Sequence, residues 1–196
     1  MAKVRAKWLR LTEETNALDY LEKANSFILL ADRDPIAWKW VILCLHTALY
    51  GFAICALRGT NPDNVTYTTK KGQQKLITFG DAIERCQNPQ FMQMTIMSRQ
   101  LVLDEADREA VRLLKKTFRD NFEHFIPKGW SIEIHGFPEM AIRVLRMIRF
   151  LAFDSGNYIH LKSGQKKRIK SIVHQATNKL KKSRLHQESI AATSQV

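Results

Sequence analysis

The chain has 196 residues, 45% of them hydrophobic, and a formal net charge of +12, which suits one domain with a buried core and a polyanionic partner. The three cysteines Cys44, Cys55 and Cys86 form no C-x-x-C pair, which argues against a disulfide framework and for a reducing compartment. The first residues carry charge without a continuous apolar segment, so we expect no signal peptide and a cytoplasmic protein.

Two long helices are predicted in the first third of the chain. Thr12 is a suitable N-cap for a helix that runs to about Ala31. Asp34 and Pro35 then open a second helix, which Gly59 ends.

The second predicted helix, residues 36–57, is the most hydrophobic stretch. Its length approaches the roughly 20 apolar residues of a membrane span. Lys39, His46 and Thr47 interrupt it, however, and Arg58 closes it. We therefore expect a central core helix and no membrane contact, with His46 as a core or interface histidine and Cys44 and Cys55 as buried free thiols.

Residues 60–102 change character. The Thr and Tyr content of residues 65–69, with Gly72 between them and residues 74–77, predicts a small β-hairpin, with a flexible loop as the alternative. Thr78 is expected to cap a short helix to about Gln87. Residues 88–102 have no clear pattern.

A further helix is predicted from Asp104 to Phe125, with apolar residues spaced by three and four: Val111, Leu114, Phe118, Phe122 and Phe125. Pro127 ends it. At about 100° per residue, Arg119 and His124 project on opposite sides of the apolar stripe and diverge by about 140°. On residue type alone they could equally form a solvated face, with Arg119 and Glu123 as an ordinary surface pair.

The segment Arg119-Asp120-Asn121-Phe122-Glu123-His124 resembles the R-x(4–6)-H motif of HEPN-domain proteins, in which a polar residue often follows the Arg. The continuation Lys128-Gly129-Trp130 is similar to a plasmid-associated prokaryotic subgroup. The resemblance covers residues 10–155. It implies a mainly α fold, an antiparallel helical bundle, here with a small β-hairpin insertion and a basic C-terminal helix.

The family resemblance also implies a function: a metal-independent endoribonuclease that leaves 2′,3′-cyclic phosphate and 5′-hydroxyl ends. His124 would be the acid/base and Arg119 the phosphate clamp, across a homodimer interface, with Asp120 and Asn121 in supporting roles. Toxin–antitoxin or phage-defence settings, with a restraining antitoxin partner, are common among relatives. The alternative is a non-catalytic HEPN-type module that binds nucleic acid or a partner.

The C-terminal part is strongly basic. Trp130 to His135 alternate as in a short strand that could lie against the hairpin, and Pro138 opens a helix to about Asp154. Residues 155–187 hold nine basic residues and no acid: Lys162, Lys166, Lys167, Arg168, Lys170, Lys179, Lys181, Lys182 and Arg184.

An amphipathic helix is expected over residues 165–186. Its apolar face would dock on the domain and leave lysines for RNA backbone: Lys166, Lys167, Lys170 and Lys181. A solvated charged face is the alternative. The predicted organisation is a domain over residues 1–155, a basic extension over 156–187 and a disordered tail over 188–196. No cofactor motif or metal-ligand spacing is present in the sequence.

Overall fold

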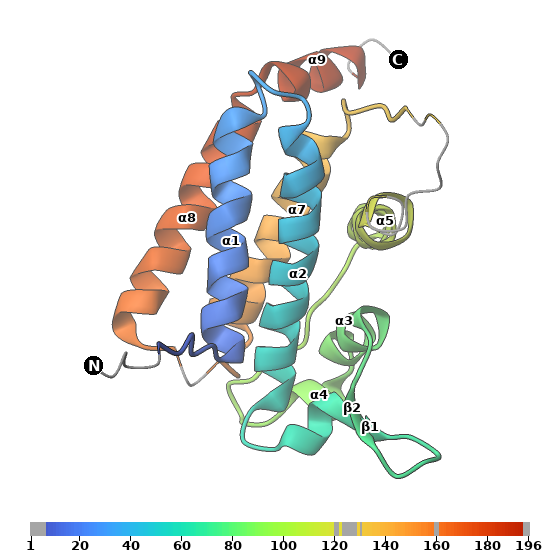
Figure 1. Cartoon of the computed structure of the whole chain (residues 1–196), viewed down its shortest axis with the longest axis vertical. Helices are drawn as coiled ribbons and strands as arrows, with labels where there is room; N and C mark the ends of the chain where they lie inside the picture. The colour runs from blue at the N-terminus through green and yellow to red at the C-terminus, as the bar shows by residue number, and fades with distance from the viewer. Residues whose placement is uncertain (1–6, 120–121, 123–128, 130, 159–160, 194–196) are drawn as a thin grey trace, which may run out of the picture.

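The bulk of the core lies between four long helices: α1 (Glu13–Leu30), α2 (Ala37–Arg58), α7 (Phe137–Arg149) and α8 (Ser163–Lys181) (Figure 1). The structure is a computed structural model that describes residues 7–119, 122, 129, 131–158 and 161–193. The prediction of a mainly helical bundle is confirmed. The cap predictions at Thr12 and Thr78 are confirmed too, since each closes a capping box. The predicted opening of α2 at Asp34 and Pro35 is slightly early, because α2 begins two residues after Pro35.

The bundle consists of two antiparallel helix pairs, α1 with α2 and α7 with α8. Helices that meet between the two pairs run parallel. The short turn after α1 makes α1 and α2 antiparallel. In the second antiparallel pair, Lys170 of α8 lies over Phe153, just beyond the end of α7. Between the pairs the order of contacts shows parallel helices. Trp38 meets Phe137 and Phe52 meets Tyr158, while Glu22 and Asp32 of α1 pair with Arg168 and Lys179 of α8, respectively. The predicted antiparallel bundle is therefore correct within each pair and wrong between pairs.

Helix α2 is the central helix of the fold. It packs against α1, α3 (Phe79–Gln87), α7 and the π-helical segment η2 (Leu113–Arg119), and most of its residues are buried. Its length and composition would also allow it to cross a membrane, yet 72% of its most apolar window is buried inside the fold. His46 is buried with its ring 4.3 Å from the Phe79 ring, as predicted for a core histidine.

Cys44 and Cys55 are buried free thiols, as predicted, and Cys86 is buried as well. Burial raises the pKa of Cys44 to about 11 and that of Cys55 to about 12, because a thiolate loses its hydration there.

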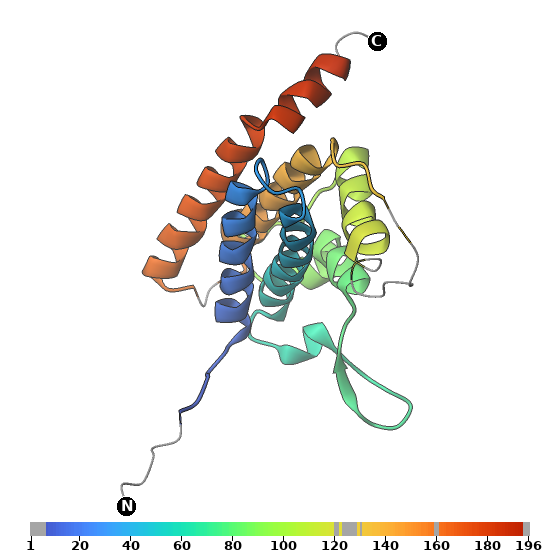
Figure 2. The same ribbon diagram turned by 45° about the horizontal axis from the view of Figure 1, so that its top comes forward.

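A long connection returns the chain from the end of α2 to the start of α7. It contains the 3-10 turn η1 (Pro62–Val65), strands β1 (Thr66–Thr68) and β2 (Gln74–Leu76), and helices α3 (Phe79–Gln87) and α4 (Pro89–Met92). Helix α5 (Glu105–Arg112) and the segment η2 (Leu113–Arg119) follow. The predicted hairpin is confirmed, with Tyr67 opposite Lys75 in an antiparallel register, and it projects from the body in Figure 2.

The predicted strand after the motif is wrong for its described part. Residues 131–135 are not a strand, and the sheet contains β1 and β2 among the residues that the structure describes. The cause is the position of this segment relative to the hairpin. Ile132 and Ile134 line an apolar pocket with Ile36 and Trp38 at the start of α2, whereas the hairpin follows the end of α2.

The C-terminal segment differs from its prediction in two ways. The expected single helix over 165–186 ends at Lys181, and Ser183, whose Oγ accepts from the His186 amide at 3.3 Å, precedes α9 (Arg184–Thr193). Residues 188–193, expected to be disordered, continue this helix. Helix α8 also shares the core of the preceding residues, since Ile169 and Ala176 are fully buried among them.

Candidate functional site

The motif follows α5 and η2. Asp104 caps α5 through a capping box with Asp107, so the predicted start of the motif helix is confirmed. Arg119 is the last residue of η2. The Arg119 side chain, together with Asp120, Asn121 and His124, lies outside the described residues.

The helix changes its winding before the motif. Residues 113–119 are π-helical, with i→i+5 hydrogen bonds and therefore more residues per turn than an α-helix. Leu114 is still fully buried and Val111 half-buried, as the predicted stripe requires. The direction of Arg119 relative to that stripe, however, no longer follows from 100° per residue, because the π-helical turns intervene.

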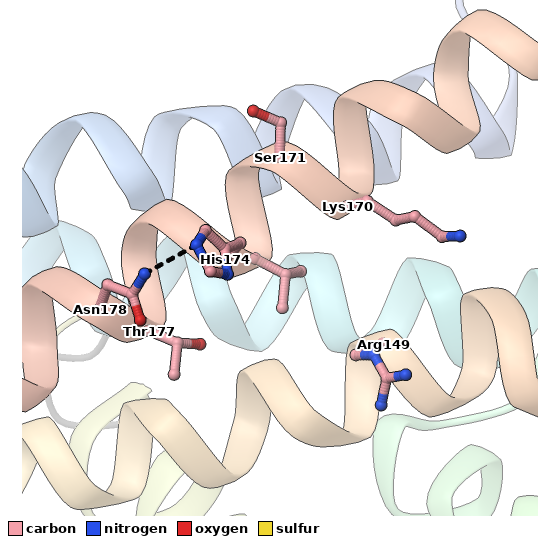
Figure 3. Close-up of a pocket in the computed structure, with 7 residues that line it drawn as sticks. Arg149, Lys170, Ser171, His174, Thr177 and Asn178 are labelled. Atoms are coloured by element: carbon pink, nitrogen blue, oxygen red, sulfur yellow. Dashed lines mark hydrogen bonds between the residues drawn. The ribbon is translucent and has the colours of Figure 1, made fainter.

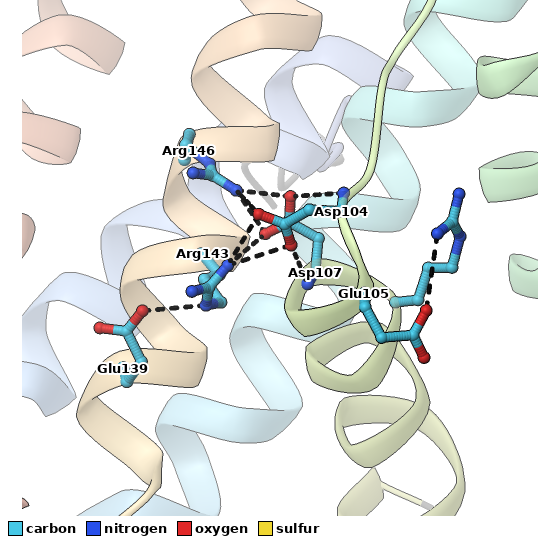
Figure 4. A network of polar contacts seen from close by, with 7 residues as sticks. Asp104, Glu105, Asp107, Glu139, Arg143 and Arg146 are labelled. Carbon is cyan, nitrogen blue, oxygen red and sulfur yellow. Dashed lines mark hydrogen bonds and ion pairs between the residues drawn. The ribbon is translucent and has the colours of Figure 1, made fainter. Parts of the chain in front are cut away.

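A buried carboxylate fixes the beginning of the motif helix on the bundle. Asp107 has a side chain only 3% exposed, and its Oδ1 accepts a hydrogen bond from Arg143 Nη1 at 3.0 Å. Arg146 Nη2 donates to the same carboxylate (Figure 4). Both arginines belong to α7, and two charge-assisted donors stabilise an ionised carboxylate away from water.

Two further carboxylates complete this network. Asp104 accepts from Arg143 at 3.3 Å, and Arg143 Nε lies 2.9 Å from Glu139 Oε1 on the same helix. The pKa of Asp104 lies below its usual value, chiefly because it accepts the Asp107 backbone N–H, with Arg143 and Arg146 adding to the effect. The network therefore holds α5 against α7 through an ionised cluster.

Helix α3 flanks η2 on another side. A Cβ placed at Gly80 would lie 3.3 Å from Lys115 Nζ, so the Lys115 side chain reaches the start of α3. There the Asp81 pKa is lowered, first by a hydrogen bond from the Thr78 hydroxyl and further by nearby Arg85 and Lys115. The backbone that leads to Arg119 therefore packs against α7 through α5 and against α2 through η2, and the Lys115 side chain reaches α3.

The second predicted site is the basic face of α8. Its apolar face is buried, as predicted: Ile169, Ile172, Val173, Ala176 and Leu180. The four predicted RNA-binding lysines, Lys166, Lys167, Lys170 and Lys181, are all exposed. The sequence did not indicate that Arg168 and Lys179 form ion pairs with Glu22 and Asp32 of α1.

These ion pairs divide the basic residues of α8 into two flanks. At about 100° per residue, Lys166, Lys170 and Lys181 fall within about 60° of one another. Arg168 and Lys179 lie about 200° and 220° from Lys166, on the flank that faces α1. Lys166, Lys170 and Lys181 form the lysine flank, and Lys170 lines a cavity with Arg149 of α7. Lys166, Lys170 and Lys181 therefore lie on the flank away from α1, and the exposed Lys167, about 100° from Lys166, lies between the two flanks.

Sequence reasoning missed Asp107, Arg143 and Arg146. The spacing Asp104-x-x-Asp107 is a capping signal that could have been read, but the pairing with α7 is a tertiary contact. In the part of the chain that the structure describes, no group of three or more His, Cys, Asp or Glu residues could hold a metal ion.

No protein-family model matches the chain, and no match was found among curated proteins or among solved structures. The HEPN resemblance thus depends on the motif residues and their place in the sequence.

Proposed function

We propose that the protein is a metal-independent endoribonuclease of the HEPN type. RNA carries its own nucleophile, the 2′-hydroxyl, so cleavage requires proton transfer and positive charge on a phosphate that becomes more negative. His124 would move the proton, since imidazole titrates near neutrality, and Arg119 would hold the phosphate oxygens. Asp120 and Asn121 would orient His124. The products would be 2′,3′-cyclic phosphate and 5′-hydroxyl ends.

The observation that supports this proposal best is the anchoring of the helix that leads to the motif. Asp107 is buried and ion-paired with Arg143 and Arg146, and Lys115 reaches α3. A catalytic Arg benefits from a fixed backbone, because transition-state stabilisation requires groups positioned before the reaction begins. The π-helical segment directly before the motif also fits, since such segments are frequent at functional sites.

We further propose that the active unit is a homodimer. With α-helical winding of about 100° per residue over residues 119–124, Arg119 and His124 would diverge by about 140°, so one copy would not direct both at the same phosphate. A second copy related by a two-fold axis could bring the two pairs into one groove. A toxin–antitoxin or phage-defence role in the cytoplasm, with a restraining antitoxin, completes the proposal.

The test is cleavage of a single-stranded RNA by the purified protein in the presence of EDTA. We expect His124→Ala to abolish cleavage and Arg119→Ala to remove most of it, with the cyclic-phosphate ends seen by mass spectrometry. Lys116→Gln, an exposed charge change on the same helix, is the control that should retain activity. Undiminished cleavage by His124→Ala would remove His124 from the mechanism. Cleavage that needs a divalent ion would contradict the metal-independent chemistry itself.

The alternative is a module that binds RNA without cleaving it. The lysine flank of α8 supports this reading, because it supplies phosphate-binding charge without any contribution from Arg119. The two functions separate in one experiment: the wild-type chain should be toxic on expression and His124→Ala tolerated if the protein is a ribonuclease, whereas a binding module should be tolerated in both forms.

A further inference from the structure

A cavity of about 660 Å³ lies between α7 and α8. Arg149 of α7 faces it, and the remaining lining residues are on α8: Lys170, Ser171, Val173, His174, Thr177 and Asn178 (Figure 3). The lining contains two permanent cations, a histidine, two hydroxyls and an amide, and no carboxylate. That volume is within the range of sites that hold small organic ligands.

The cations of the cavity are held in place without being neutralised strongly. Lys170 Nζ lies 5.2 Å above the centroid of the Phe153 ring, a cation–π contact that orients the ammonium group. Arg149 Nη1 is 3.4 Å from Asp154 Oδ2, and the side chains are 59% and 39% exposed. A surface pair of this kind contributes little, so an anion can compete with Asp154 for the guanidinium.

The rest of the lining suits the remainder of a nucleotide. Asn178 Nδ2 lies 2.8 Å from His174 Nε2, which orients the imidazole (Figure 3). Val173 gives the cavity an apolar wall, and Thr177 can hydrogen-bond a sugar or base edge. Arg and Lys together provide a planar fork and a point charge for one phosphate group.

We propose that this cavity is a binding site for a nucleoside phosphate. Arg149 and Lys170 bind the phosphate, and the sugar and base lie against Val173, His174 and Thr177. The nucleotide can come from an RNA strand that runs along the lysine flank of α8, or it can be a free mononucleotide. The first source rests on the proposed function, in which RNA is the substrate.

The experiment measures binding to the full chain by fluorescence and by amide NMR shifts, with three probes: a short 2′-O-methyl RNA, uridine 5′-monophosphate and inorganic phosphate. The 2′-O-methyl group prevents cleavage, so the result does not depend on whether the protein is a ribonuclease. We expect Arg149→Gln/Lys170→Gln to weaken nucleotide binding by at least about tenfold, as loss of charge-assisted hydrogen bonds implies.

The matched control is Lys7→Gln/Arg10→Gln, which removes the same two charges from exposed positions before α1 and should change affinity by less than about twofold. A second variant, Thr177→Leu, fills the cavity without changing charge. It should weaken nucleotide binding and leave phosphate binding unchanged. Arg149 and Lys170 are exposed, so the variants should keep the thermal unfolding midpoint of the parent.

The outcomes are separable. Loss of binding of the oligonucleotide in the double variant identifies an RNA strand as the source, and loss for the mononucleotide alone identifies a free nucleotide. Equal affinity of wild type and double variant for both probes overturns the proposal. Binding of inorganic phosphate as tight as that of the nucleotide overturns its nucleoside part. None of these outcomes depends on the behaviour of His124→Ala.

Discussion

Asp107 on α5 and Arg143 on α7 are joined by a hydrogen bond of 3.0 Å between Oδ1 and Nη1, with the carboxylate almost completely buried. A buried carboxylate that has lost its cationic partner is costly, and Arg143, with a side chain 23% exposed, would lose its buried partner if the carboxylate were neutralised. This pair therefore determines how firmly the helix that leads to Arg119 is attached to the bundle.

We expect Asp107→Asn to lower the free energy of unfolding by about 2–4 kcal/mol, because it removes the charge that Arg143 and Arg146 share. Urea denaturation measures this, and RNA cleavage by the variant at low temperature tests the link to the motif. Glu105→Gln is the control: its carboxylate is 91% exposed and lies 3.6 Å from Arg108, so it should cost no more than about 0.5 kcal/mol. Equal stability of the two variants would contradict the assignment.

The same network predicts that the protein loses stability at acidic pH. The pKa of Asp104 in the folded state lies below its usual value, so its contribution is present above the unfolded-state pKa of about 3.9 and is lost as pH falls through the folded value. Asp104→Asn retains an N-cap side chain but cannot ionise. The urea midpoint of the wild type should therefore fall more steeply than that of Asp104→Asn as pH is lowered from 5. Parallel curves would exclude this role.

Gly51 allows α1 and α2 to approach closely. A Cβ added there would lie 2.7 Å from the Ala17 Cβ, so the helices would have to separate. Gly→Ala inside a helix ordinarily stabilises by about 1 kcal/mol, but we expect Gly51→Ala to destabilise by about 1–3 kcal/mol because overpacking prevails. Thermal unfolding checks the sign.

Gly80→Ala is the matched comparison for Gly51. Its added Cβ would meet only the flexible end of Lys115, at 3.3 Å, and the Thr78 hydroxyl at 3.8 Å. It should be neutral or stabilising. A Gly51→Ala variant more stable than the wild type would contradict close packing of α1 against α2 at this position.

Truncation after Gly164 should unfold the protein. Ile169, Ala176 and Leu180 of α8 are at most 1% exposed, and their loss would uncover apolar surface on α1 and α7. Circular dichroism should show no cooperative transition for this chain. A chain that ends at Lys182 keeps α8 and should unfold cooperatively. A folded truncation at Gly164 would instead restore the independent 1–155 domain that the sequence suggested.

Much of the helical fold could be predicted from the sequence because the signals are local. Capping residues, prolines and apolar runs located the four long helices, and the predicted caps Thr12 and Thr78 act on amides three residues away. The hairpin signal around Gly72 was equally local. Composition also identified the lysines of α8 and the buried thiols.

The failures share a physical cause. The strand expected at residues 130–135 is missing from its described part, residues 131–135, because packing places Ile132 at the opposite end of α2 from the hairpin. The helix break before Ser183 and the continuation of α9 depend on contacts of that serine with Leu180 and His186, which apolar periodicity does not reveal.

By itself, the sequence determined which segments are helical, which of their faces are apolar and where positive charge is concentrated, since each depends on residues within a few turns of one another. Only the tertiary structure decided that the helix pairs lie parallel, that Asp107 meets Arg143 and Arg146, and that Arg149 and Lys170 share a cavity. These partners are distant in sequence. Which distant ionic or apolar groups come into contact is decided only when the whole core packs.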